Sequence, residues 1–242
     1  MFFVDGQRAS WALVVTMIYC NLIRSVIGRR PWSHCAGSII GDQVEMKSAF
    51  RLQAIAQNGL LFASCDSEQQ RYRELMEIAT EMAAELGAAE LSEIRALYGA
   101  AGGYATPLVD VRATVFEGER LLLLRSEVEG VWCLPGGWAH LNVSPSESAA
   151  GHLAQLLGRA VHVERVLAVW DNPSVQDSLL SYPFYGIVFQ CTVVGSEDDL
   201  PGTVRFFTYS EVAELELAVG YRNRLKQLFR FQQPTCCCPE FD

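Results

Sequence analysis

The sequence has no apolar run long enough to cross a membrane. Its most apolar stretch, Trp11–Ile23, is about thirteen residues long, whereas a membrane-spanning helix needs about 20. The charges of Asp5 and Arg8 cancel ahead of it and no small-residue cleavage site follows, so the pattern is not that of a secretory signal. We therefore expect a cytoplasmic protein without a membrane partner. Its functional part is expected to begin near Met46, after an extension, residues 1–45, of doubtful structure.

Basic residues are scarce: 19 Lys and Arg stand against 28 Asp and Glu, for a formal net charge of −9. A general nucleic-acid binder needs a basic face, so this balance argues against a nucleic-acid partner. A mild basic cluster near the end of the chain alternates with leucines, which is typical of an amphipathic helix rather than of a DNA-recognition helix. Its members are Arg222, Arg224, Lys226 and Arg230.

Paired cysteines are also missing, because the eight cysteines form no Cys-x-x-Cys motif. Five of them lie far apart, and a chain with 50% hydrophobic residues can build a core without disulfides. We therefore expect reduced thiols and a globular fold. The other three are the adjacent Cys236–Cys238, which cannot readily converge on one metal ion and are expected to form an exposed, oxidation-prone tail.

Helical periodicity dominates the segment after Met46. The pattern predicts a first helix that ends at Asn58-Gly59, a second that closes at Gly87, and a third over Leu91–Tyr98. These helices contain too few residues to bury a strong core alone. This helical domain, residues 46–101, should therefore pack on the next domain or on a second copy of the chain. A homodimer is one such arrangement.

Strand periodicity begins after Gly102-Gly103 and predicts a second domain over residues 102–242. A hairpin turn is expected at Glu117-Gly118, between the first two strands. The predicted strands cover residues 109–116, 120–125, 161–170, 185–194 and 203–208, and the late helices cover residues 210–217 and 221–231.

The most informative segment is WCLPGGW, residues 132–138. Its two glycines allow the backbone to adopt positive φ and to approach a ligand closely. The sequence SPSE at Ser144–Glu147 follows, and it predicts a capping box with proline at the first helical position. The helix should run to Leu157, with Gly158 placed to terminate it.

This order of strand, Leu-Pro-Gly-Gly-Trp loop and capped helix resembles the signature of the Nudix hydrolases, and the resemblance covers about residues 50–242. It implies an α+β fold, the Nudix α/β/α sandwich with a mixed sheet, preceded by a small helical N-terminal domain. Leu52–Leu60, Gly103–Pro107 and Pro239–Asp242 are similar to segments of one bacterial subgroup. The resemblance implies action on nucleoside diphosphates linked to another moiety, such as ADP-ribose or CDP-choline.

The sequence departs from the family's pattern at the residues that carry its chemistry. The family's helix presents glutamates on one face to hold Mg²⁺ or Mn²⁺, which stabilise pyrophosphate charge and ionise the attacking water. Here Val143, His152, Gln155 and Leu156 occupy the glutamate positions, Gly151 the arginine position and His140 the position of a common loop aspartate. We therefore assign no catalytic residue and no metal ligand.

Other residues could supply ligands or a binding surface. His140 and His152 could bind a softer ion, although two histidines are a weak metal site. Replacement carboxylates could come from Asp171 or from a late acidic cluster, while Glu147 is better explained by its cap. The cluster, which is also typical of a solvated helix edge, comprises Glu211, Glu214 and Glu216.

A nucleotide-type small molecule is the expected partner. The resemblance implies a phosphate contact from Arg125, and Trp138 could stack on a base or fill its own core. Asp171 could face the pocket or serve as a turn residue. The candidate binding residues are Arg125, Gly136, Gly137, Trp138 and Asp171, and the aromatic residues Tyr182, Phe184 and Tyr185 are expected in the core and at a strand edge.

Two functions remain open at this point. The first is a Nudix-fold protein whose hydrolase centre is impaired and whose role is nucleotide binding or vestigial. The alternative is an active pyrophosphatase of the ADP-ribose or CDP-choline type that uses Mg²⁺ or Mn²⁺ on relocated ligands. A regulatory nucleotide sensor and a structural dimerisation module are further candidates.

Overall fold

The computed structural model describes residues 39–86, 90–100, 102–126, 130–172, 183–195, 200–218, 220–232 and 238–241, with side chains from residue 45 onward. The chain divides into two compact units, residues 1–105 and 106–242, each of which is described by itself. Most of the extension, the apolar stretch Trp11–Ile23 and Tyr182 lie outside the described residues. So do Cys236 and Cys237, whereas Cys238 is exposed.

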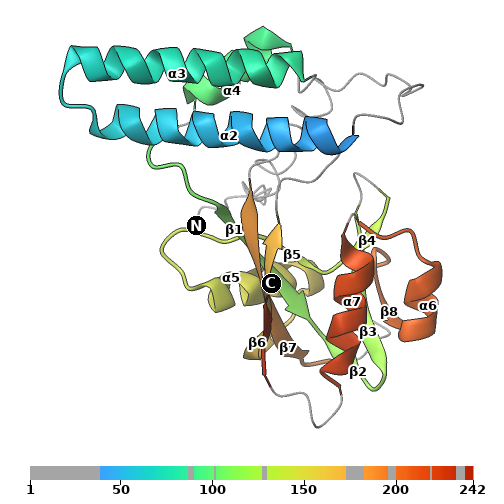
Figure 1. Cartoon of the computed structure of the whole chain (residues 1–242). Helices are drawn as coiled ribbons and strands as arrows, with labels where there is room; N and C mark the ends of the chain where they lie inside the picture. Colours follow the sequence, from blue (N-terminus) through green and yellow to red (C-terminus); the bar gives the residue numbers. More distant parts are fainter. Residues whose placement is uncertain are drawn as a thin grey trace, which may run out of the picture. The chain divides into compact units, whose positions relative to one another are not determined.

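The first unit contains three helices, α2 (Ile39–Phe62), α3 (Asp66–Glu85) and α4 (Leu91–Ala100). Figure 1 shows α2 and α3 side by side as a helical hairpin. The prediction that the first helix ends at Asn58-Gly59 is wrong, because α2 continues to Phe62. Glycine is tolerated inside this helix because the ring of Tyr72 packs there: a Cβ on Gly59 would lie 2.2 Å from Tyr72 Cε1.

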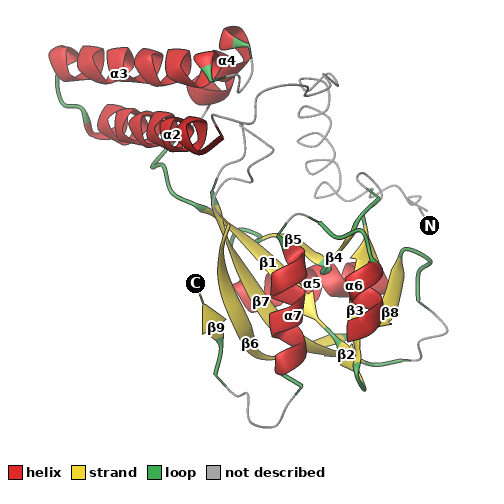
Figure 2. Ribbon diagram, turned by 45° about the vertical axis from the view of Figure 1, so that its right-hand side comes forward, coloured by secondary structure: helices red, strands yellow, loops and turns green. Residues whose placement is uncertain are grey.

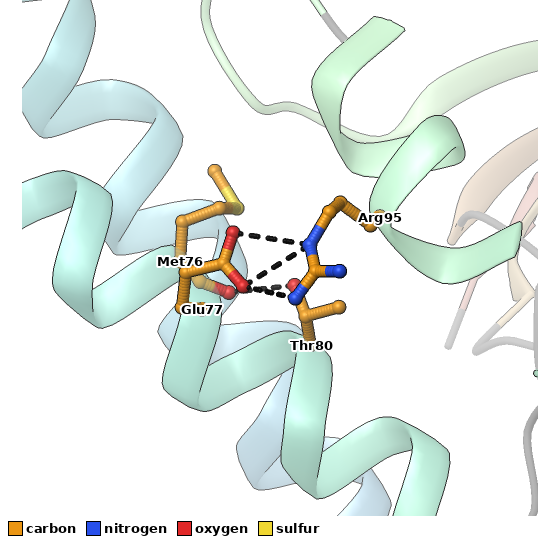
Figure 3. Close-up of polar contacts among 4 residues, drawn as sticks. All are labelled: Met76, Glu77, Thr80 and Arg95. Carbon is orange, nitrogen blue, oxygen red and sulfur yellow. Dashed lines mark hydrogen bonds and ion pairs between the residues drawn. The ribbon is translucent and has the colours of Figure 1, made fainter. Parts of the chain in front are cut away.

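Helix α4 is tied to α3 by an ion pair (Figure 3). Arg95 Nη2 lies 2.7 Å from Glu77 Oε2, and Arg95 Nε also donates to both carboxylate oxygens. Both side chains are about half exposed, so solvent screens the pair and it contributes little to stability. Nearby, the buried Thr80 satisfies its hydroxyl by donating to the carbonyl of Met76 at 2.7 Å.

The second unit is built on two sheets. One has the order β5-β1-β7-β6-β9, and it is mixed because β1 runs parallel to β7 while β7 runs antiparallel to β6. In the other sheet, β3 pairs with β2, β4 and β8. The strands are β1 (Leu108–Thr114), β2 (Phe116–Glu117), β3 (Arg120–Arg125), β4 (Trp132–Cys133), β5 (Gly136–Trp138), β6 (Val161–Asn172), β7 (Phe184–Val193), β8 (Val204–Thr208) and β9 (Glu240–Phe241).

Helices cover both sides of these sheets, which gives the predicted α+β sandwich (Figure 2). Strand β3 shows why: Leu122 belongs to the core cluster under α5 (Pro145–Leu157), whereas Leu121 and Leu123 belong to the cluster under α7 (Tyr221–Arg230). Successive strand residues face opposite sides, so one apolar strand serves two cores. The short α6 (Tyr209–Glu214) precedes α7.

Helix α5 begins and ends as its sequence predicts. Ser144 accepts a hydrogen bond from the Glu147 amide, Glu147 accepts one from the Ser144 amide, and Pro145 opens the helix. Gly158 ends it in the left-handed conformation, with φ 66°. The predicted strand over residues 109–116 differs, because it is divided between β1 and β2.

Among the described residues, no helix combines the length and hydropathy that crossing a membrane requires. In the described ranges, Cys65, Cys133, Cys191 and Cys238 form no disulfide.

Candidate functional site

The loop before α5 is held against strand β1 at two glycines. Gly136 pairs with Arg112, and its φ of 150° lies in the region that favours glycine. A Cβ on Gly136 would lie 2.0 Å from the carbonyl oxygen of Val111, so no larger residue fits without moving β5. A Cβ on Gly137 would lie 3.1 Å from Cε1 of His152, which brings this loop against α5.

A buried ion pair fixes the start of the same loop, and sequence reasoning missed it. Arg112 donates to both carboxylate oxygens of Asp110, at 2.6 and 2.9 Å, and to the carbonyl oxygen of Leu134 at 3.0 Å. Burial raises the pKa of Asp110, and the charge of Arg112 opposes that shift. The available signal was the pattern Asp110-Val111-Arg112, two opposite charges on one face of an otherwise apolar strand.

His152 ties α5 to the loop. Its Nε2 lies 2.9 Å from the carbonyl oxygen of Trp138, and because a carbonyl only accepts, Nε2 carries the proton. Burial lowers the pKa of His152, so its neutral form is favoured. The ring of His140 lies 4.6 Å from that of His152, centroid to centroid, and the His140 amide donates to Ser148 Oγ at 2.9 Å.

Trp138 presents an aromatic surface beside β7. Its side chain is 41% exposed, and its ring meets that of Phe184 edge-on at 5.2 Å between centroids. The loop residues Gly136, Gly137 and Trp138 thus come together with His152, and Tyr185 lies next along β7 with an exposed side chain. The indole of Trp138, which is exposed and held in edge-to-face contact with Phe184, can stack on a flat ligand.

Arg125 and Asp171 lie outside the loop itself, Arg125 opposite Trp132 of β4 and Asp171 opposite Tyr185 of β7. Arg125 ends β3, and its Nε donates to the carbonyl oxygen of Gly130 in the following turn at 3.1 Å. Asp171 is exposed and lies within β6, which continues to Asn172 rather than ending at Trp170. Its backbone carbonyl accepts from Arg224 Nη2 at 2.7 Å.

Most of the remaining charged candidates cap helices or pack against them. Glu147 and Glu211 both complete capping boxes, and hydrogen bonds from Ser144 and Thr208 lower their pKa values. Glu214 and Glu216 are exposed. On α7, Arg222 donates to backbone carbonyls at the end of α6, and Arg224 lies over the ring of Trp170 at 4.9 Å. Two members of the basic cluster, Arg222 and Arg224, therefore make contacts that pack α7 against the rest of the unit.

Comparison with known proteins identifies the family. Residues 46–98 match the family described as the UDP-X-like N-terminal oligomerisation domain of Nudix proteins. A Bacillus subtilis (strain 168) protein, YjhB, provisionally named an ADP-ribose pyrophosphatase, is 30% identical over 189 residues, which cover 77% of this chain and 91% of that protein. The chain belongs to the Nudix hydrolase family.

Two solved structures are also similar to this chain. A UDP-X diphosphatase is 27% identical, with a TM-score of 0.47, over 83% of this chain and 99% of that one. An ADP-ribose pyrophosphatase from Streptococcus suis is 21% identical, with a TM-score of 0.46, over 57% of this chain and 100% of that one. At these scores the likeness adds nothing to the assignment, which rests on the Bacillus subtilis relative.

The residues of α5 do not fit the divalent cation that a Nudix hydrolase uses. On the relevant face His152 and Leu156 are half-buried, Gln155 is exposed, and Leu156 packs against the core under α5. Mg²⁺ and Mn²⁺ prefer several anionic oxygen ligands, which this face does not offer. Nor do three or more His, Cys, Asp or Glu side chains converge anywhere in the described part of the chain.

Gly151 and Val143 occupy the two remaining positions at which the Nudix signature has charged residues. A Cβ on Gly151 would meet no atom within 4 Å, so glycine is not required there by packing. Val143 is 46% exposed before the start of α5, where it stabilises no core. Neither Gly151 nor Val143 belongs to the buried core.

Proposed function

We propose that this Nudix family member is catalytically impaired and retains a site for a nucleotide-type ligand. One observation carries the proposal: His152 stands where the family's helix bears a metal-binding carboxylate, and it donates a hydrogen bond to the Trp138 carbonyl. A neutral imidazole in that role ties the helix to the loop and contributes no negative charge for a hard cation.

Retention of the ligand site is supported by the loop itself. Gly136 and Gly137 still allow the close approach of the loop to β1 and α5, and the Asp110–Arg112 pair still anchors its start. Trp138 keeps an exposed ring beside Phe184 for stacking on a base or ribose. A nucleoside diphosphate linked to another moiety is the ligand class that the named relatives suggest.

The first test measures binding and turnover separately. Calorimetric titration with ADP-ribose and with CDP-choline should give binding without cation-dependent turnover, and Trp138→Ala should weaken it by about tenfold, on the order of one stacked base. Val194→Ala is the matched control, because Val194 is an apolar residue that is 79% exposed and lies away from the loop. Release of nucleoside monophosphate with Mg²⁺ or Mn²⁺ is followed on the same samples.

Restoring the carboxylates tests the impairment. The variant Val143→Glu, His152→Glu, Gln155→Glu and Leu156→Glu should gain cation-dependent turnover if only the metal site was lost. Turnover by the unmodified protein that EDTA abolishes would contradict the proposal. It would favour the alternative, an active pyrophosphatase with relocated ligands, which the provisional name of the Bacillus subtilis relative suggests.

We further propose that the chain forms a homodimer through its helical unit. The match of residues 46–98 to a family described as an oligomerisation domain supports this proposal. Light scattering on the full chain measures the mass of the particle, and a mass of one chain across the micromolar range would contradict it.

A further inference from the structure

The helical unit has a groove between α2, α3 and the segment after α4, with a volume of about 510 Å³. We call it the aromatic groove and define it by Ile55, Asn58, Gly59, Phe62, Tyr72 and Tyr104. Cavities of this size, roughly 300–1,000 Å³, accept drug-sized groups.

Hydrogen bonds hold one wall of the groove in place. Gln57 Nε2 donates to the carbonyl oxygen of Gly103 at 2.9 Å, and the Ala105 amide donates to Asn58 Oδ1 at 2.6 Å. These bonds fix the main chain on both sides of Tyr104. Its ring then meets that of Phe62 edge-on, at 6.3 Å between centroids.

The rings of Phe62 and Tyr104 contact each other, but both are largely exposed to solvent. Phe62 is 71% exposed and Tyr104 is 61% exposed, and Ile55 beside them is 52% exposed. An isolated exposed apolar residue is ordinary, whereas several of them around one hollow mark an interaction site. Because hydrogen bonds already hold the main chain on both sides of Tyr104, little backbone entropy is lost there when a partner covers this ring.

We infer that the aromatic groove is the contact between two copies of this chain, with Phe62 of each copy entering the groove of the other. Every residue of the groove except Tyr104 lies within residues 46–98, the segment that matches an oligomerisation domain. A two-fold dimer brings the same patch of both copies together, and a patch that carries both an exposed ring and a hollow is self-complementary. The inference rests on the proposed homodimer and is independent of nucleotide binding.

Substituting Phe62 tests the contact. Light scattering and sedimentation of the full chain should show that Phe62→Glu weakens dimerisation at least about 30-fold, as loss of a central aromatic anchor does. Val194→Glu is the control, because it adds the same charge at an exposed apolar residue of the other unit and should leave the dimer unchanged. Circular dichroism checks the fold, and nucleotide titration of both variants should match the unmodified protein.

The results separate the two proposals. A monomeric unmodified protein overturns both the homodimer and the groove contact, whereas a dimer that Phe62→Glu leaves intact overturns the groove contact alone. Photo-crosslinking covers the case in which Phe62→Glu does not fold. A benzoyl-phenylalanine in place of Tyr104 should crosslink to α2 of the second copy, and a crosslink to Trp11–Ile23 of the same chain instead would overturn the inference.

Discussion

The two ends of helix α5 differ from its middle in how closely they follow the Nudix signature. At the ends, Ser144 and Glu147 form a complete capping box and Gly158 closes the helix in the left-handed conformation. In the middle, the positions that carry carboxylates in Nudix hydrolases hold His152, Gln155 and Leu156. The helix thus has complete caps, while the residues at these middle positions are not acidic.

This contrast separates the determinants of folding from those of catalysis. Capping satisfies backbone groups that every helix must satisfy, whatever its function. A carboxylate on the middle of the helix satisfies no such need, so it can be replaced without loss of the helix. Like the caps, the buried Leu153 on the core-facing side of α5 is needed for folding.

Removing the core contact of α5 should have the largest effect. Leu153 is fully buried, so Leu153→Ala should lower the free energy of unfolding by about 2–5 kcal/mol, as urea denaturation would measure. Gln155→Ala, at an exposed position of the same helix, should change it by less than about 0.5 kcal/mol. Similar losses from both would show that the two faces do not differ as described.

The two glycines of α5 should respond with opposite signs. Gly158→Ala places a Cβ at φ 66° and should destabilise by about 1–2 kcal/mol. Gly151→Ala adds a Cβ in open space within the helix and should stabilise by about 0.5–1 kcal/mol. Thermal unfolding of both variants measures the difference, and a loss of stability in Gly151→Ala would indicate that glycine has a structural role in the middle of α5.

The smallest effect is expected from pH. The pKa of His152 is lowered by burial, with the Trp138 carbonyl and Asp110 opposing the shift and His140 and Arg112 adding to it. The unfolded chain then binds the proton more tightly, so the contribution of His152 is present above the unfolded pKa of about 6.5 and is lost as pH falls below it.

Urea denaturation between about pH 5 and pH 8 measures this dependence. His152→Gln should flatten the decline toward low pH, because its amide can still donate to the loop but does not titrate. An unchanged slope in this variant would assign the pH dependence to other groups.

Much of the second unit was predictable from the sequence, because its signals are local. Capping boxes, a left-handed glycine and strand alternation each depend on neighbours within a few residues, and the bounds of α5 followed from Ser144 and Gly158. Asn58-Gly59 misled the same reasoning. Gly59 is held inside α2 by Tyr72, a packing contact with another helix that local rules do not include.

The candidate site was predictable only in part. The loop glycines and Trp138 were singled out in the sequence, and the structure places them beside His152. The positions without carboxylates follow from the resemblance to the Nudix signature. It did not identify the bond from Arg112 to the Leu134 carbonyl or the bond from His152 to the Trp138 carbonyl, because each joins segments that are distant along the chain.

The sequence by itself determined the resemblance to the Nudix signature, the bounds of α5 and the non-acidic residues on that helix. The tertiary structure decided what the residues at these positions contact: His152 binds the loop, and Leu156 packs against the core. It also decided that Gln57 and Asn58 hold the chain around Tyr104. Residue identity fixes which groups are available, but burial and non-local pairing fix which of them are charged, bonded or left exposed.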